Sequence, residues 1–456
     1  MASYFVSTTG SDSNPGTELS PWRNPWIIAT KTFAPGDTIF MRGGTYVIQT
    51  QAWSSHNKPT VHIRQSGTAA NGITVRNYVS ESPILNGSSN GSNAILGVSE
   101  DFTSNYVTFD GLEVTNSTGN LMGLRGGSNN LTVQNCTIHG AALAAADNVS
   151  AIRIEPATTV LIKNCSLYDV HNSADDANAT CITIYASTGV TIENCEFSDA
   201  PAGLHMKTAT GNVSDITLRN SYIHDLTSYG VGVSFAPGDL INAVKVYQNI
   251  FSTTGSGLKQ DSGGDSGQVN NMEVYNNVFH NYTGTGLASP EYQGSTNYKA
   301  YNNICYRVGT ASRDILTYDD TPNCTGASVV INILNYNLYR RTTGFSVLYG
   351  SGTGGCAQTY STFTDWQASG HGYDANSIEG SEPLFVGPLT SPIGFKLQAG
   401  SPARNLGRVG GTSGGATVDA GAYPLRTECI GIGCEAAPEP EPEPAAAASP
   451  TLMFIG

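Results

Sequence analysis

The stretch Leu131-Thr-Val-Gln-Asn135-Cys-Thr-Ile138 joins two short strands through an Asn, and the chain repeats this pattern seven more times. The corresponding polar residues of the later copies are Asn164, Asn194, Asn220, Gln248, Asn276, Asn302 and Asn335. Successive copies are 26 to 33 positions apart. Strands this short cannot bury a face alone, so a repeat of this length indicates a solenoid.

The repeat predicts parallel β-strands. Each unit alternates apolar and polar residues over strand-length runs, with Gly, Asn, Ser and Thr turns between them, and it has no helical periodicity. Helical repeats are therefore excluded, leucine-rich repeats would need a different Leu and Asn spacing, and propeller blades are longer. We expect an all-β, right-handed parallel β-helix with one coil per repeat and strands stacked about 4.8 Å apart.

The repeated Asn and the Cys that follows it predict two stacked columns. An Asn at a tight corner can bond the equivalent Asn or backbone of the next coil, so we expect an inward Asn ladder. Cys136, Cys165 and Cys195 follow it and should stack as small apolar fillers, because one thiol per coil cannot build a tetrahedral metal cage. Two further pairs of cysteines are spaced for local bridges, with the connectivity left open: Cys429 with Cys434, and Cys324 with Cys356.

Composition limits the class of partner. The chain has 456 residues, 52 Gly, 13% charged residues and a formal charge of −14. Low charge with many turn residues suits a long β-solenoid, and no basic cluster favours nucleic acid. The sequence contains no run of eighteen apolar residues, so it predicts no membrane-spanning helix. The opening Met1-Ala-Ser-Tyr-Phe-Val has no basic or apolar leader, so we expect an extracellular protein, either a mature secreted form or part of a virion.

Five segments are expected along the chain. In order they are a strand and cap (1–36), the parallel β-helix (37–425), a Cys-containing end (426–434), a Pro/Glu/Ala linker (435–450) and an apolar tail (451–456). Pro25 to Lys31 can form a short amphipathic helix that caps the open end of the solenoid. Residues 341–425 are interpreted as irregular terminal coils and a far cap. We favour a docking peptide over a remnant for the tail, with an unidentified partner.

Motifs near both ends of the β-helix resemble a known superfamily. Gly10-Ser-Asp-Ser-Asn-Pro-Gly-Thr17 and Pro35-Gly-Asp-Thr-Ile-Phe-Met-Arg-Gly-Gly-Thr-Tyr46 resemble the opening of pectate-lyase-like right-handed β-helix proteins. Ser381-Glu-Pro-Leu-Phe385, Gly400-Ser-Pro-Ala403 and Asp419-Ala-Gly-Ala-Tyr423 are similar to their closing coils. The resemblance covers residues 4–425 and is closest to the family nine pectate lyases. Because the superfamily includes lyases, glycosidases, epimerases, phage tailspikes and adhesins, the site must decide the activity.

One face of the solenoid collects the cations. In each coil a strand reads small–apolar–X–apolar–X, so its two X positions point outward. We expect the first outward column to contain Arg125, Arg153, Thr183, His205, Gly232 and Lys259. The second column includes Glu155, Tyr185, Lys207, Ser234 and Asp261. Lys207 and Lys259 should lie two coils, or about 10 Å, apart, with Arg153 a similar distance beyond Lys207. An alternative is that these exposed Lys and Arg residues only keep the protein soluble or prevent strand edges from pairing.

These cations suit uronate chemistry. Elimination across C4–C5 of a uronate needs its carboxylate neutralised, the C5 proton removed and the leaving O4 stabilised. A Lys or Arg whose pKa is lowered by cationic neighbours can remove the proton. We expect Lys207 to be the base, with His205 and Arg153 binding the carboxylate and Lys259 as the second candidate. Tyr185 and Arg125 complete the substrate-binding candidates.

The resemblance adds two lysine motifs and a metal. Gly257-Leu-Lys259 resembles the Gly-apolar-Lys stretch that carries the catalytic Lys of family nine pectate lyases. Lys207-Thr-Ala-Thr-Gly-Asn212 resembles the Lys segment of alginate and dermatan lyases, but Gly232 and Ser234 stand where their Arg is expected. In the resembled lyases calcium lies beside the base, and calcium takes six to eight oxygen ligands. The candidate Ca2+ ligands here are Asp175, Asp176, Glu155, Asp261 and Asp265, without the Asp-Asp-Gly-x-Asp run of family nine.

Three functions stay open. The favoured one is a polysaccharide lyase that cleaves an acidic polysaccharide. The second is a glycan-binding or virion-attachment protein that uses tyrosines such as Tyr185, Tyr292 and Tyr318 as sugar-stacking platforms. The third is a β-helical glycoside hydrolase, whose carboxyl groups would come from Asp175, Asp176 and Glu155.

Overall fold

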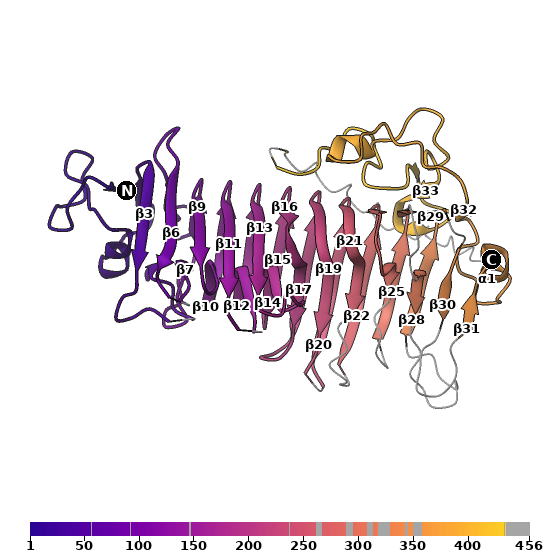
Figure 1. The fold of residues 1–456 in the computed structure, drawn as a ribbon, viewed down its shortest axis with the longest axis horizontal. Helices are drawn as coiled ribbons and strands as arrows, with labels where there is room; N and C mark the ends of the chain where they lie inside the picture. Colours follow the sequence, from indigo (N-terminus) through magenta and orange to yellow (C-terminus); the bar gives the residue numbers. More distant parts are fainter. Residues whose placement is uncertain are drawn as a thin grey trace, which may run out of the picture.

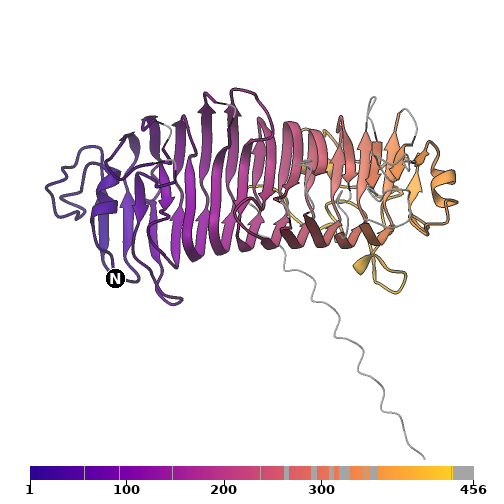
Figure 2. The same ribbon diagram turned by 90° about the horizontal axis from the view of Figure 1, so that it is seen from below.

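The chain folds as a right-handed parallel β-helix, as predicted (Figure 1). In the computed structural model the described residues are 1–434, apart from 56, 92, 146, 237, 261–266, 289–294, 308–312, 318–328, 343–344, 350–357 and 433. Within this part of the chain, 28 strands form one sheet in which successive coils pair in parallel. The coils stack along one axis and give an elongated molecule (Figure 2).

Each coil contributes to three walls. The site wall contains β4 (Val61–Ile63), β7 (Leu96–Val98), the first parts of β10 (Met122–Gln134) and β12 (Val149–Lys163), β14 (Ala179–Tyr185), β17 (Ala200–Lys207), and the last parts of β19 (Tyr222–Ser234) and β21 (Ile250–Gln260). The second wall contains β1 (Ser3–Val6), β2 (Thr38–Met41), β5 (Ile73–Asn77), β8 (Val107–Asp110), the last parts of β10 and β12, β15 (Thr188–Glu193), β18 (Val213–Arg219), β20 (Leu240–Tyr247), β22 (Gln268–Tyr275), β25 (Ser295–Tyr301) and β28 (Val329–Asn335).

The third wall lies between the end of the second wall and the next strand of the site wall. It contains β3 (Gly44–Gln49), β6 (Pro83–Ser89), β9 (Glu113–Ser117), β11 (Thr137–Leu143), β13 (Ser166–Asn172), β16 (Glu196–Ser198), the first parts of β19 and β21, β23 (Val278–His280), β26 (Ile304–Arg307), β29 (Leu338–Arg341) and β32 (Ile378–Glu379). β24 (Thr285–Ala288), β27 (Arg313–Thr317), β30 (Val347–Tyr349) and the antiparallel β31 (Gln358–Tyr360) form a separate four-stranded sheet.

The repeated Asn turns the corner between the second and third walls. Asn135, Asn164 and Asn194 have φ values of 52° to 54°, a left-handed conformation that Asn tolerates better than most residues. Asn135 is exposed, and the Asn194 amide donates to the carbonyl of Cys434 outside the core. The expected bonds between equivalent Asn residues are present, since Asn164 Nδ2 donates to Asn135 Oδ1 over 3.4 Å and Asn302 Nδ2 donates to Asn276 Oδ1 over 3.3 Å. The expectation that this ladder points inward is wrong, because the left-handed corner turns the side chains outward.

The inward ladder lies one residue later in the repeat. Asn249 Nδ2 donates to Asn277 Oδ1 over 3.1 Å, and Asn277 repeats this bond to Asn303 over 3.1 Å. Asn303 continues it to Asn337 over 3.2 Å. The same column is occupied by Cys136, Cys165 and Cys195 in earlier coils, all buried free thiols, as predicted. Of the two expected bridges, Cys429–Cys434 is present, and Cys324 and Cys356 lie outside the described residues.

The C-terminal segment runs back along the solenoid instead of only adding coils. Gly421 N donates to Asn302 O over 2.7 Å, and Gly431 N donates to Asn220 O over 2.9 Å, so later residues reach earlier coils (gold, Figure 1). The returning segment includes η3 (Pro392–Phe395), β33 (Gly407–Arg408), η4 (Val409–Gly411) and β34 (Thr417–Val418), whereas α1 (Phe363–Gln367) lies before β32, at the far end of the solenoid (Figure 1). The expectation of terminal coils over 341–425 holds for the parallel strands up to β32 and is wrong beyond them.

An outward apolar column explains this path. Its members are Tyr222, Ile250, Val278, Ile304 and Leu338, and they pack against Phe395, Ala420 and Tyr423 of the returning segment. In the earlier coils the same column holds Thr137, Ser166 and Glu196. Apolar side chains on an outer wall must be covered, so the segment lies where the column changes from polar to apolar.

The N-terminal end is closed by η1 (Pro25–Thr30), a 3-10 helix that buries Ile28 and Ala29. β1 already pairs in parallel with β2, so the stack extends ahead of the expected start at residue 37. Among the described helices none has the length and apolar character needed to cross a bilayer. The linker and tail, residues 435–456, lie outside the described residues.

Candidate active site

The predicted outward face exists on the site wall. Arg153, Thr183, His205, Gly232 and Lys259 are aligned in register across β12, β14, β17, β19 and β21 (Figure 1). Their neighbours along each strand, such as Ile154, Ile184 and Leu204, are buried in the core. Alternation within a strand therefore identified the face correctly.

Arg125 is the exception to the predicted columns. It aligns with Glu155 in the second column, and Gly123 takes its expected place beside Arg153. The predicted position of Arg125 is therefore wrong by two residues along the strand. Because side chains alternate between faces, a shift of two leaves Arg125 on the outward face but moves it from the first column to the second. A register irregularity between Arg125 and Ser128 absorbs the difference in repeat length, and the sequence period does not reveal it.

Lys259 lies in a cleft beside the site wall. The cleft has a volume of about 690 Å³ and is lined by Asp175, Asp176, Asn178, Ser228 and Lys259, among others. One side of the cleft is formed by the loop 173–178, which connects β13 to β14. The other side is formed by the turn at 227–228 within β19. The Lys259 side chain is exposed and lines this cleft.

Lys207 has a different environment from its expected one. The residue is 8% exposed, and its ammonium donates to Asn178 Oδ1 over 2.8 Å and to Asn148 Oδ1. These two Asn residues come from the loops that precede β12 and β14, so Lys207 ties the loops of neighbouring coils together. Two amide acceptors stabilise the charged ammonium. This arrangement suits a fixed positive charge better than a base.

His205 is fully buried, which overturns its expected contact with substrate. Its Nε2 lies 2.6 Å from Ser234 Oγ, and its Nδ1 lies 2.8 Å from the Tyr229 hydroxyl and 3.2 Å from Ala177 O. Burial and the positive charges of Lys207 and Lys259 hold the pKa of His205 well below its usual range. The imidazole is therefore neutral and serves as an internal hydrogen-bonding group.

Tyr229 links this buried group to Lys259. Its ring lies over Gly232, where a Cβ would overlap it, and the Lys259 amine lies 5.8 Å from the ring centroid. Gly232 stands where the resemblance to alginate and dermatan lyases predicts an Arg. The Tyr229 ring fills the space that a side chain at this position would need. No motif pointed to Tyr229, although its spacing of three residues from Gly232 is visible in the sequence.

Arg125, Arg153 and Glu155 form a buried ion-pair group. Glu155 Oε2 accepts from Arg125 Nη1 over 3.1 Å and from Arg153 Nη2 over 2.6 Å. Arg153 also stacks over the Tyr185 ring at 4.6 Å, and Tyr185 is only 4% exposed. Burial and the charge of Arg153 lower the pKa of Arg125 to about 10, so the Arg125 guanidinium stays charged at neutral pH.

This group lies far from the cleft. Arg153 is four strand steps from Lys259 in the same column, which corresponds to about 19 Å. Arg153 therefore cannot neutralise the carboxylate of a sugar held at Lys259. A carboxylate paired with two arginines is also a poor calcium ligand, so the expectation that Glu155 helps to bind Ca2+ is wrong.

The adjacent acids lie in the cleft, as a metal site would require, but both are engaged. Asp176 Oδ1 accepts from Asn172 Nδ2 over 2.8 Å and from Asn178 N over 2.9 Å. Burial acts to raise the pKa of Asp176, but these bonds and the charge of Lys207 lower it below its usual range. Asp175 accepts from His171 Nδ1 over 2.8 Å.

Only some of the predicted calcium ligands lie among the described residues. Asp261 and Asp265 lie outside them, as do Tyr292 and Tyr318. Asp175 and Asp176 offer the oxygen ligands that calcium prefers, yet two carboxylates fall short of six to eight oxygens. The described part of the cleft does not by itself fit the ion.

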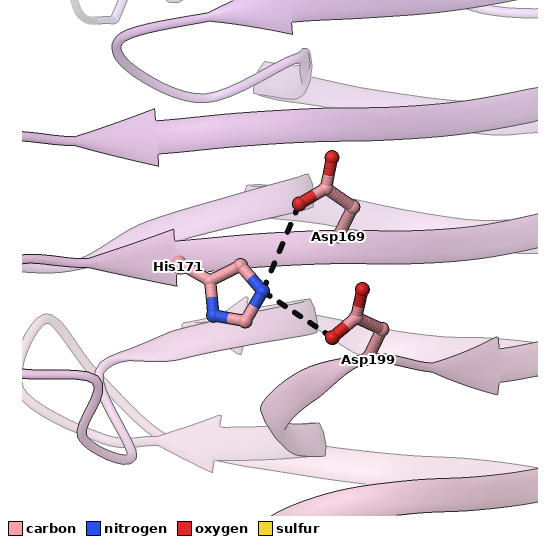
Figure 3. Close-up of side chains that lie close together, drawn as sticks. All are labelled: Asp169, His171 and Asp199. Carbon is pink, nitrogen blue, oxygen red and sulfur yellow. Dashed lines mark ion pairs between the residues drawn. The ribbon is translucent and has the colours of Figure 1, made fainter.

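A separate acidic cluster surrounds His171 on the third wall (Figure 3). Its Nε2 lies 3.7 Å from Asp169 Oδ1 and 3.5 Å from Asp199 Oδ1, two residues at the same position of neighbouring coils. Burial alone would lower the pKa of His171, but the bond to Asp175 and the three nearby carboxylates raise it. A protonated His171 therefore neutralises these acids and anchors the cleft loop through Asp175. The sequence signal, Asp169-Val-His171, is short and was not recognised.

Comparisons with known proteins agree with this fold. A family model described as a Pel9A-like right-handed β-helix region matches residues 4–196, and a model for a right-handed β-helix region matches residues 150–325. The chain is 29% identical to Pectate lyase L of Paenibacillus polymyxa (strain SC2), over 61% of this chain and 59% of that protein. The match thus spans less than two thirds of that relative.

Solved structures show the same architecture. The crystal structure of pectate lyase Pel9A aligns with a TM-score of 0.59 at 17% identity and covers 93% of this chain and 96% of that one. A rhamnogalacturonan lyase aligns with a TM-score of 0.52 at 14% identity and covers 74% of this chain and 87% of that one. At these identities the alignments establish the fold, and the chemistry depends on the side chains in the cleft.

Proposed function

We propose that the chain is a polysaccharide lyase that cleaves an acidic polysaccharide by β-elimination, with Lys259 as the base; the match of residues 4–196 to the Pel9A-like right-handed β-helix model and the likeness to Pectate lyase L support this proposal. The observation that carries the proposal is the exposed side chain of Lys259 in a cleft beside the site wall. Of the two predicted lysines, Lys259 is accessible, whereas Lys207 is covered by two loops.

The proposed step follows from the chemistry of a uronate. The neutral Lys259 amine takes the C5 proton, the freed electron pair forms the C4–C5 double bond, and the C4–O4 bond breaks. The departing O4 takes a proton from water and becomes the hydroxyl of the new chain end, and the Lys259 ammonium later returns its proton to solvent. The step needs positive charge near the carboxylate, where negative charge develops. Lys207 supplies part of it, because it donates to Asn178, which itself lines the cleft.

Tyr229 supports the base in this proposal. Its ring contacts Lys259 from the wall side and is fixed by the bond to His205. The ring limits the positions that the Lys259 side chain can take, and it attracts the ammonium that forms once the amine has taken the proton. His205, Tyr229 and Lys207 are thus proposed as positioning groups rather than as groups that touch the reacting atoms.

The hydrolase alternative is weakened by the acids. A glycosidase needs a general acid with a raised pKa, and the pKa of Asp176 is lowered instead. Glu155 is held between two arginines. We therefore do not favour hydrolysis. An extracellular location is part of the lyase proposal, because long polysaccharides are degraded outside cells.

The test is the absorbance of the unsaturated product with pectate, alginate and glycosaminoglycans as substrates. Lys259→Ala should lower kcat/KM on the preferred polymer by about 100-fold or more, the usual contribution of a general base. Lys245→Ala is the matched control, since Lys245 is an exposed lysine on the second wall, and its activity should be unchanged.

Other outcomes decide the remaining alternatives. Reducing sugar without absorbance would support a hydrolase, and retention on a glycan column without turnover would support a binding protein. A parallel series with a chelator and with added calcium tests whether the activity depends on Ca2+. Full activity of the Lys259→Ala protein would sink the assignment of the base.

A further inference from the structure

A second hollow lies at the N-terminal end and is lined by residues of η1 and of β3, which belongs to the third wall. Its volume is about 420 Å³, within the roughly 300–1,000 Å³ of small-ligand pockets. It is lined by Thr8, Arg23, Asn24, Pro25, Trp26, Thr45, Tyr46, Val47 and Gln49. None of these residues belongs to the cleft that contains Lys259.

The apolar part of the hollow is a platform. Trp26 is half-buried, so part of its indole faces solvent, and the neighbouring Val47 is 47% exposed. In the described chain the Trp26 indole N–H has no hydrogen-bond partner. A wall that leaves a tryptophan partly bare beside an exposed valine offers a flat surface to a ligand with an apolar face, such as a sugar ring.

Arg23 adds a cation at the rim. Its side chain is exposed and forms no ion pair or hydrogen bond with the described residues. The nearby Asp12 carboxylate accepts from Arg23 N over 3.0 Å, from Asn24 N over 2.9 Å and from Asn24 Nδ2 over 2.7 Å. Asp12 thus fixes the loop that presents Arg23, and the guanidinium keeps its donors for an outside anion.

The polar lining completes the chemistry of one ligand class. Thr8, Thr45 and Gln49 bring hydroxyl and amide groups to the same hollow. An aromatic platform, a free guanidinium and neutral hydrogen-bonding groups together match a sugar that carries a carboxylate. We propose that this hollow, the cap site, binds a uronic acid residue of a polysaccharide, and the choice of sugar class rests on the proposed function.

The cap site is distinct from the catalytic cleft in position. Along the third wall, β3, β6, β9, β11 and β13 pair in sequence, and the cleft loop follows β13. Four strand steps separate the two sites along the axis, or about 19 Å. They also lie on different walls. One or two sugars cannot occupy both sites, so the cap site would hold a distant part of the same polymer or another chain.

The test measures binding and turnover separately. Binding of galacturonate, mannuronate and glucuronate hexasaccharides, and of a neutral hexasaccharide of equal length, is measured by calorimetry in the Lys259→Ala background. Trp26→Ala should weaken binding of the preferred acidic oligomer to the cap site by about tenfold. Arg23→Gln should weaken binding of the acidic oligomer by about fivefold and leave binding of the neutral oligomer unchanged.

Control variants separate binding from folding. Trp53→Phe alters another half-buried tryptophan, whose indole donates to Thr60 O over 3.3 Å, and should leave binding unchanged. Trp26→Phe retains an aromatic platform and should restore most of the affinity that Trp26→Ala loses. In otherwise unaltered protein, Trp26→Ala should raise KM on long polymer and leave kcat unchanged.

The outcomes distinguish this inference from the proposed function. Binding that depends on Trp26 in a protein without elimination activity would support the cap site and remove the lyase proposal. Elimination activity with oligomer binding that is insensitive to both Trp26→Ala and Arg23→Gln would overturn the cap site alone. Equal loss of the neutral and acidic oligomers in Arg23→Gln would overturn the assignment to uronate.

Discussion

At the scale of single residues, the site depends on which cations the neighbouring loops cover. Lys207 and Lys259 have similar sequence surroundings, with an apolar residue before each lysine and a Gly further upstream. Only Lys259 remains exposed, because Asn148 and Asn178 from two successive loops close over Lys207. An outward direction on a β-helix wall therefore does not guarantee access. Accessibility is decided by the length and polar groups of the adjacent loops.

The contact between Tyr229 and Lys259 leads to a prediction at this scale. Tyr229→Leu removes the ring that supports the amine, so kcat should fall by about tenfold with little change in KM. Tyr229→Phe retains the ring and loses the hydroxyl that bonds His205 and Ala177 O, and it should keep most of the activity. The measurement is steady-state kinetics by absorbance on the preferred polymer. Equal activity losses in the Phe and Leu proteins would argue against a role for the ring.

At the scale of elements, the loop 173–178 is held in place by an ion pair between Asp175 in the loop and His171 on the third wall. Asp175 lines the cleft and is held by His171, whose ring also lies between Asp169 and Asp199 (Figure 3). The loop therefore links the third wall to the site wall. Its anchoring depends on the proton that His171 carries.

The raised pKa of His171 fixes the sign of the pH dependence. A raised folded-state pKa means that the stabilisation is fully present below pH 6.5, the ordinary pKa value, and is lost as pH rises through the folded-state pKa above it. Hydrogen exchange of the loop amides should therefore show weaker protection above that pH than below it, after correction for intrinsic rates.

His171→Asn provides the control for this prediction. Its side chain can still donate a hydrogen bond to Asp175 but does not titrate, so the extra loss of protection at higher pH should vanish. A loop whose protection changes with pH in the same way in both proteins would rule out His171 as the titrating anchor.

At the scale of the whole molecule, the returning C-terminal segment and the outward apolar column stabilise each other. Phe395 is 1% exposed and packs edge-on against His280 and Phe385, with ring centroids 5.2 and 5.4 Å apart. This second core joins residues that are more than one hundred positions apart in the sequence. It therefore couples the end of the chain to the middle of the solenoid.

Phe395→Ala should lower the free energy of unfolding by about 3–5 kcal/mol, the usual cost of removing a buried aromatic ring. Ile393→Ala, in the same short helix η3, changes a side chain that is 64% exposed and should alter stability by less than about 0.5 kcal/mol. Denaturant unfolding followed by circular dichroism measures both. Similar stabilities of the two proteins would mean that the segment is not coupled to the solenoid as described.

The sequence by itself determined the solenoid, its period and the wall that carries the cations. These features follow from local rules, because alternation along a strand selects the face and a left-handed corner favours Asn. Even the apolar outward column from Tyr222 to Leu338 is visible in the sequence, although its cover was not foreseen.

Only the tertiary structure decided the register of Arg125, the burial of His205 and Lys207, and the path of the last described residues. Each of these depends on groups from other coils: strand pairing places Arg125 beside Glu155 instead of Arg153, and loops of neighbouring coils cover a side chain. Such contacts have no period along the chain, so their partners become known only when the coils are stacked.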